Sequence, residues 1–322
     1  MVLVKKLCSI FMILCMMSLF FTACGNQEES SSQAKGEKSS DILKIGLMPD
    51  TDSIPFIIAQ EKGYFKEEGV DVELEHFKSA MDRDSALQSG NLDGGVSDML
   101  ALGFAKSGGF DVKMTSRTDG NYCLIGGSNN LASDIKQMSG QNISVSKNTI
   151  IEFVLDQMLS KSQMSEEDIN KTVIPQIPTR LEMLQNGKLD GAVLPEPMGS
   201  IAVKNGSHLV NSSEQMKINP GIMVFTTASL NQKGSQIKAM YRAYNKAVDY
   251  LNNTPQEEYI DLVVEKAGLP PTTKEALTMP KYSKATLPDK ADWEKSIEWL
   301  NSKELVKETY SYEDMVSDIL ND

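Results

Sequence analysis

The sequence predicts an α/β fold with mainly parallel strands, and two observations support this fold class. From Asp41 onward, short apolar runs bounded by Gly, Pro, Asn or Asp alternate with runs of helical periodicity. After Thr227 the pattern changes to helix alone, with apolar side chains at helical spacing from Ile237 to Leu251. Alternating strands and helices are typical of parallel sheets that are covered by helices.

The expected strands are short and end in turn-forming residues. They are Leu43–Met48, Val70–Leu74, Val112–Ser116, Tyr122–Gly126, Asn142–Val145, Thr172–Pro175, Leu189–Leu194 and Ile222–Thr227. Helices are expected between and after them at Pro55–Lys62, Met81–Ser89, Asp98–Lys106, Ile150–Ser160, Arg180–Asn186, Pro197–Asn205, Gln256–Ala267, Ala291–Asn301 and Tyr312–Leu320. Capping-box patterns begin at Thr149 and at Thr179. Trp293 and Trp299 lie on one of these helices, where we expect them to pack in the core.

The first 23 residues have the features of a secretory signal. Lys5 and Lys6 precede an almost wholly apolar run from Leu7 to Phe21, which is short for a membrane span. Small residues then precede Cys24, a pattern that resembles a bacterial lipobox, although Phe21 departs from it. We expect Cys24 to be lipidated after cleavage; the alternative is an ordinary signal peptide followed by a coincidental cysteine.

Residues 24–41 precede the first expected strand. The stretch Gly25–Ser40 within them has no large apolar side chain and is rich in Ser, Gln, Glu, Gly and Lys. Such a segment cannot bury enough surface to fold, so we expect a flexible tether. Cys8 and Cys15 would leave with the signal and Cys24 would carry lipid. Only Cys123 then remains, which excludes an intrachain disulfide in the mature chain.

The charge balance and the residue counts exclude several classes of function. The 322-residue chain has 32 Lys and Arg against 44 Asp and Glu, a formal charge of −12, which disfavours binding to nucleic-acid phosphates. Only two histidines occur, His76 and His208, so a His-rich metal site is not expected. The sequence contains no Walker loop, serine-hydrolase elbow, zinc-protease motif or Cys-x-x-Cys. Asp50 and Asp52 form an acid pair that we interpret as turn residues. No catalytic residue, metal or cofactor is predicted.

Polar side chains gather where several expected strands end. In open α/β sheets ligands bind outside the carboxyl ends of the strands. Because polar turns follow several expected strands, the sequence favours a binding site for a small polar molecule at these ends. The turns are 49–55, 94–98, 115–117, 146–149 and 194–197.

Four blocks of sequence resemble one family of solute-binding proteins. Gln60–Phe65, followed by Glu68–Val72, is similar to the opening of the ABC-importer binding proteins for nitrate, sulfonate, taurine and thiamine-pyrimidine precursors. The other blocks are Gln88–Asp98, Leu184–Val193 with the following Pro-Glu-Pro turn, and Leu305–Val316. The resemblance covers residues 42–320 and does not specify the ligand.

The resemblance implies a two-lobed periplasmic-binding-protein fold of type II with two crossover hinge strands. The first lobe would comprise residues 42–127 and 222–322, and the second residues 128–221. The hinge strands would lie near Tyr122–Gly127 and Ile218–Val224. Ligand contacts present only in the closed form would drive the lobes together.

The resemblance also implies a set of cleft residues. Carried over by position, they are Asp52, Ser53, Ser97, Asp98, Thr115, Arg117, Lys147, Asn148, Thr149 and Glu196. Thr149 is also explained by its capping box. Arg117 and Lys147 either pair with an anion or remain solvated at the rim of the cleft. Arg117 and Lys147 favour an anionic ligand such as a sulfonate or a carboxylate. The acids Asp52, Asp98 and Glu196 favour a ligand with N–H donors, such as an aminopyrimidine. The sequence leaves both classes of ligand open.

The sequence therefore predicts an extracytoplasmic, membrane-anchored monomer that delivers a small solute to an ABC permease and its ATPase. Two alternatives remain: a biosynthetic enzyme on the same bilobal fold, and a lipoprotein sensor or adhesin module. The export signal and the isolated Cys123 argue against the enzyme. A neighbouring permease gene would argue against the sensor or adhesin.

Overall fold

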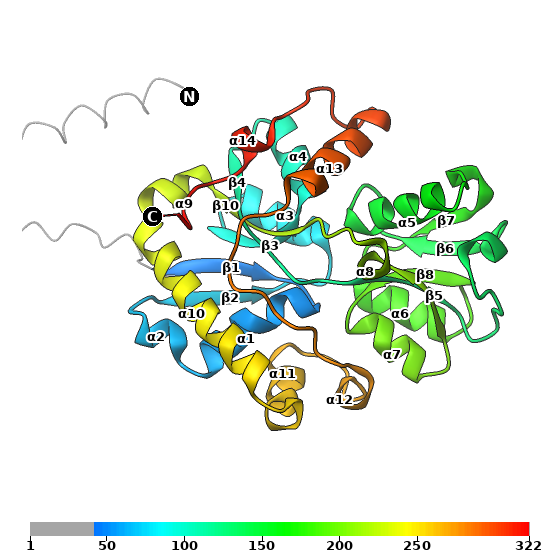
Figure 1. The fold of residues 1–322 in the computed structure, drawn as a ribbon, viewed down its shortest axis with the longest axis horizontal. Coiled ribbons are helices and arrows are strands. Elements are labelled where there is room, and N and C mark those ends of the chain that lie inside the picture. The colour runs from blue at the N-terminus through cyan, green and yellow to red at the C-terminus, as the bar shows by residue number, and fades with distance from the viewer. Residues whose placement is uncertain (1–41, 322) are drawn as a thin grey trace, which may run out of the picture. The chain divides into compact units, whose positions relative to one another are not determined.

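Ten strands form two five-stranded sheets in residues 42–321, the part of the chain that the computed structural model describes (Figure 1). In the first sheet the strand order is β2 (Val72–His76), β1 (Leu43–Leu47), β3 (Gly94–Asp98), β10 (Gly221–Thr226) and β4 (Val112–Arg117). In the second sheet it is β7 (Asn170–Val173), β6 (Asn142–Val145), β8 (Gly191–Pro195), β5 (Tyr122–Gly126) and β9 (His208–Ser212). Each sheet with its helices is called a lobe below.

Helices follow most of the strands. In the first lobe they are η1 (Thr51–Ser53), α1 (Ile54–Glu61), α2 (Tyr64–Glu67), α3 (Ala80–Gln88), α4 (Met99–Ser107), α9 (Thr227–Gln232), α10 (Gly234–Asn253), η4 (Gln256–Glu258), α11 (Ile260–Lys266), α12 (Thr273–Ala276), α13 (Lys290–Ser302) and α14 (Tyr312–Met315). In the second lobe they are η2 (Ile135–Met138), α5 (Ile150–Lys161), η3 (Glu166–Asp168), α6 (Ile177–Gln185), α7 (Met198–Lys204) and α8 (Ser213–Met216). The predictions for residues 1–41, namely the signal, the lipidated Cys24 and the tether, lie outside the described residues.

In each sheet four strands run in one direction and one runs in the opposite direction. The opposed strand is β10 in the first sheet, where it pairs antiparallel with β3 and β4. It is β5 in the second sheet, where it pairs antiparallel with β8 and β9. The other printed pairings are parallel, as the alternating sequence pattern predicts.

The chain changes sheets twice, and the first change comes earlier than expected. It passes from β4 to β5 through residues 118–121 and returns from β9 to β10 through residues 213–220. Strand β5, placed by the sequence in the first lobe, therefore belongs to the second, and the expected boundary at residue 127 is wrong by one strand. The reason is that β5 pairs with β8 along its whole length and with β9 from Cys123 to Gly126.

Two strands, β3 and β9, were not among the expected ones. Strand β3 begins with Gly94 and Gly95, which read as a turn. Both glycines are needed for close packing, because a Cβ on Gly94 would lie 2.4 Å from the Val224 carbonyl oxygen and one on Gly95 would lie 2.9 Å from the Gly46 carbonyl oxygen. The last expected helix is also shorter than predicted: α14 ends at Met315, because Val316 forms a β-bridge with Met114.

The long helix α10 confirms the apolar stripe that the sequence predicts. Its buried face includes Ile237, Met240, Tyr241, Tyr244, Ala247, Val248 and Leu251. It packs against α1, so that the Phe56 and Tyr244 rings lie 4.9 Å apart between their centroids. Among residues 42–321, no helix has both the length and the apolar character needed to cross a membrane.

The two lobes are in direct contact outside the crossings. Thr51 N donates to the Glu196 carbonyl oxygen at 2.9 Å, and Ile177 N donates to the Lys78 carbonyl oxygen at 3.1 Å. Helix α13 of the first lobe also reaches α5 of the second, where Trp299 Nε1 donates to Asp156 Oδ2 at 3.0 Å. Both tryptophans of α13 are buried, as expected for packing residues.

Candidate functional site

A narrow cavity of about 40 Å³ lies between the lobes, at the carboxyl ends of strands from both sheets. The first lobe contributes residues that follow β1 and the last residues of β3, together with Arg83 of α3. The second lobe contributes residues that follow β6 and β7, the last residue of β8 and the first residue of β5. This is the position that the sequence predicts for a ligand site. The principal lining residues are Met48, Asp50, Arg83, Ser97, Asp98, Tyr122, Ser146, Thr149, Ile150, Ile177, Arg180 and Pro195.

Three of the predicted cleft residues line this cavity: Ser97, Asp98 and Thr149. Asp98 ends β3 and caps α4, since its Oδ1 accepts from Ala101 N at 2.9 Å. Its second oxygen lies 3.9 Å from Arg83 Nη2. Thr149 caps α5 by accepting from Ile151 N at 3.2 Å. Both side chains thus have structural partners as well as a place in the cavity wall.

Arg83 is a buried cation of the first lobe that the sequence did not single out. It donates to Asp84 through Nε at 2.9 Å and Nη2 at 2.7 Å, and through Nη1 to the Val96 carbonyl oxygen at 3.1 Å. Burial works against its charge, but the acids Asp84, Asp98 and Asp50 raise its pKa. Arg83 is therefore a neutralised charge that holds α3 against β3.

Arg180 is the second buried cation, and the sequence did not single it out either. Its side chain is fully buried at the start of α6. Nε donates to the Val193 carbonyl oxygen at 3.1 Å, and Nη1 donates to the carbonyl oxygens of Ile174 at 2.9 Å and Pro175 at 3.3 Å. Nη2 has no hydrogen-bond partner. Burial lowers its pKa to about 9, so the guanidinium is still charged at neutral pH.

Asp50 is the third charged lining residue outside the predicted set of cleft residues. Its Oδ1 accepts from Ser53 N at 3.1 Å and from Ser53 Oγ at 2.9 Å. Burial raises the pKa of Asp50 to about 6, against the effect of the Ser53 hydrogen bonds and of Arg83. Burial also raises the pKa of Asp98 to about 6, although Arg83 opposes it. The first-lobe wall thus holds two carboxyls whose pKa values are raised to about 6.

Asp52 and Ser53 point elsewhere. Ser53 is buried and its hydroxyl also accepts from Met48 N at 3.0 Å. Asp52 is 2 % exposed and neither carboxyl oxygen makes a hydrogen bond. It packs against the crossing segment, since a Cβ on Gly120 would lie 2.1 Å from Asp52 Oδ2. Burial and neighbouring Asp50 raise its pKa well above the ordinary value, so its surroundings at the crossing favour the protonated form.

The other predicted cleft residues also lie outside the cavity. Thr115 is buried in the first lobe, where its hydroxyl bonds to the Met223 carbonyl oxygen at 3.1 Å and to Tyr241 at 2.5 Å. Arg117 and Glu196 line a separate groove of about 820 Å³ beside the crossings. Asn148 has a left-handed backbone, φ 59°, and its N donates to Glu152 at 2.6 Å. Lys147 is exposed.

Cys123 is buried beside Glu196. Its Sγ donates to Glu196 Oε1 at 3.3 Å, and burial together with Glu196 raises the pKa of the thiol. A thiol with a raised pKa is a poor nucleophile at neutral pH. This environment fits a structural cysteine.

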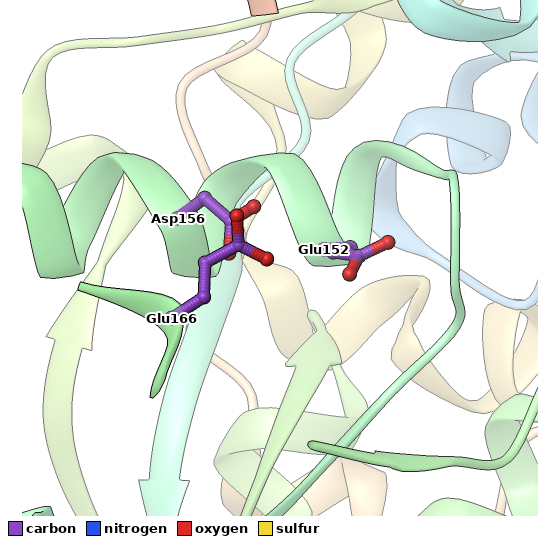
Figure 2. A group of neighbouring side chains, drawn as sticks. All are labelled: Glu152, Asp156 and Glu166. Atoms are coloured by element: carbon purple, nitrogen blue, oxygen red, sulfur yellow. The ribbon is translucent and has the colours of Figure 1, made fainter. Parts of the chain in front are cut away.

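One acidic cluster has the spacing of a metal site. Glu152 and Asp156 of α5 and Glu166 of η3 place carboxyl oxygens within 4.8 Å of one another (Figure 2). The ammonium group of Lys171 lies 2.8 Å from Glu152, 2.7 Å from Asp156 and 2.7 Å from Glu166. Lys303, the residue after α13, also pairs with Asp156, at 2.9 Å, and with Glu166. Two lysines thus pair with the three acids, and Lys303 joins the end of α13 in the first lobe to the second lobe.

The raised pKa of Asp98 predicts that the free energy of unfolding falls as the pH rises from about 4 to 6.5. The unfolded chain releases the Asp98 proton near pH 3.8 and the folded chain near pH 6, so between these values the folded state binds more protons. Between pH 5 and pH 7.5 this carboxyl should cost about 1.5 kcal/mol of unfolding free energy. Urea unfolding of the wild type and of Asp98→Asn, which keeps a cap for α4, measures the difference. Equal losses of stability in the two proteins would contradict the assignment.

Comparison with known proteins supports the same fold. The family model described as NMT1/THI5 like matches residues 50–258. No curated protein matches the sequence significantly. The structure of the alkanesulfonate-binding protein SsuA from Xanthomonas axonopodis pv. citri bound to MOPS has a TM-score of 0.74 at 16 % identity, over 86 % of this chain and 98 % of that one.

Two further solved structures are similar. The periplasmic aliphatic sulphonate binding protein SsuA from Escherichia coli has a TM-score of 0.71 at 16 % identity, over 87 % of this chain and 92 % of that one. The periplasmic nitrate-binding protein NrtA from Synechocystis PCC 6803 has a TM-score of 0.64 at 16 % identity, over 77 % of this chain and 74 % of that one. The predicted two-lobed periplasmic-binding-protein fold is confirmed by these neighbours. Because the family model covers more than half of the sequence, the chain belongs to the NMT1/THI5-like family.

Proposed function

We propose that the chain is the substrate-binding lipoprotein of an ABC importer, which captures a small polar organic solute between its lobes and passes it to a permease. The observation that carries the proposal is the cavity between the carboxyl edges of both sheets, lined by buried Asp50, Asp98 and Arg180. A binding protein needs such polar groups to fix a solute, and needs them on both lobes so that closure depends on the solute.

The solute is proposed to be a sulfonate- or taurine-like anion, or a thiamine-precursor-like pyrimidine. Structural neighbours described as sulfonate-binding and nitrate-binding support an anion. The carboxyls of Asp50 and Asp98 support a ligand with N–H donors. The protein would act outside the cytoplasm, tethered by lipid on Cys24 through residues 24–41.

A thermal-shift screen of the full chain tests the proposal. Alkanesulfonates, aminopyrimidines, nitrate and amino acids are added at several concentrations. A true ligand adds about 2.7 kcal/mol to the unfolding free energy at 100 times its dissociation constant, so the melting temperature should rise with concentration. A flat response to every compound would contradict solute binding. A ligand without a permease and ATPase encoded beside the protein would favour a sensor or adhesin instead.

A further inference from the structure

The two walls of the cavity carry opposite charges, and Arg180 supplies the positive one. Three backbone carbonyl oxygens fix its guanidinium through Nε and Nη1. None of the ion pairs found among residues 42–321 includes Arg180, and its buried Nη2 has no hydrogen-bond partner. A buried cation without a counter-charge costs free energy that an anionic ligand group would offset. The free nitrogen is therefore suited to an acid group of the solute.

The facing wall of the first lobe is acidic. Asp50 and Asp98 line the cavity, and a third acid, Asp84, which is not part of the lining, is ion-paired with Arg83. Arg83 is the one cation that lines this wall, and its two shortest hydrogen bonds go to Asp84. Three carboxyls thus face one guanidinium. A protonated amine or another N–H donor of the solute would complete this wall.

The rest of the lining is mainly apolar, apart from Ser97, Ser146 and Thr149, and leaves little room. Met48, Tyr122, Ile150 and Ile177 lie between the charged groups. The cavity volume of about 40 Å³ suits a solute of a few heavy atoms. Resting on the proposed function, we infer that the solute is small and amphoteric, with an acid group bound by Arg180 and an N–H donor bound by Asp50 and Asp98. The two ligand classes that the sequence leaves open thus describe two ends of one molecule.

Titration calorimetry with size-matched probes tests this inference on the full chain. One set contains 2-aminoethanesulfonate, ethanesulfonate and ethylamine; another contains β-alanine, propionate and propylamine; nitrate and an aminopyrimidine complete the panel. The wild type should bind an amphoteric member at least tenfold more tightly than either partner that lacks one charge. If a singly charged compound binds as tightly, the inference fails and the proposed function stands. If no compound binds, the proposed function fails with it.

Substitutions then assign each end of the solute. Arg180→Met should weaken binding of the amphoteric probe by roughly 100-fold, because a hydrogen bond to a charged group is lost. Arg180→Lys keeps the charge and should recover part of that loss, which separates ligand binding from folding. Asp98→Asn should reduce the preference for the aminated probe over its unaminated partner. Lys188→Met removes an exposed cation of the same lobe and should leave affinity unchanged. An unchanged affinity in Arg180→Met would overturn the assignment.

Discussion

Lys171→Met should lower the free energy of unfolding by about 3–5 kcal/mol, because it removes the shared partner of three carboxylates. The ammonium group lies within 2.8 Å of Glu152, Asp156 and Glu166. Glu152 and Asp156 are buried on α5, so their charges cannot be hydrated once the lysine is gone. Urea unfolding at pH 7.5 measures the loss.

The matched control for Lys171→Met is Lys290→Met. Lys290 forms an exposed ion pair with Glu313 at 2.8 Å, and water screens such pairs so that they contribute little to stability. If Lys171→Met cost no more than this control, the three carboxylates would not depend on Lys171 for stability, and the proposed role of Lys171 would be wrong.

Trp299→Ala should also cost about 3–5 kcal/mol, because it opens a cavity where α13 meets α5. The Trp299 ring meets Phe153 edge-on, with 5.8 Å between centroids, and its Nε1 donates to Asp156. Trp299→Phe keeps an aromatic ring and loses the donor, so about 1–3 kcal/mol should be lost. Equilibrium unfolding of the three proteins gives both values. A larger loss in Trp299→Phe than in Trp299→Ala would contradict this packing.

Most strands could be predicted because each is a short apolar run between turn-forming residues. Strands β5 and β6 have the bounds that the sequence predicts. Strand β3 was missed because Gly94 and Gly95 lack the β-branched side chains that identify a strand, and only the packed neighbours β1 and β10 explain them. The capping box at Thr179 was misplaced, since α6 already begins at Ile177.

The site was predicted in part, for a physical reason. Asp98 and Thr149 follow strand ends, and the parallel strands bring them to one edge. Asp52 and Thr115 also lie near strand ends, but the sequence does not show whether a side chain faces the cleft or the crossing. They remain predictions as ligand contacts.

Arg83 and Arg180 were missed because an arginine within a helix usually lies on its solvated face. A signal for Arg180 was nonetheless present in the sequence. It is three residues after Ile177 and four before Leu184, which places it on the buried face of α6. A charged residue within an apolar stripe is a general indication of a buried polar site.

The central claim, that a solute is held between the lobes without chemical change, can be tested by one measurement. The full chain is incubated with its best ligand, the complex is separated from free compound, and the released compound is identified by mass spectrometry. The account predicts one unaltered ligand molecule per chain. A released compound of altered mass would show catalysis and contradict the account.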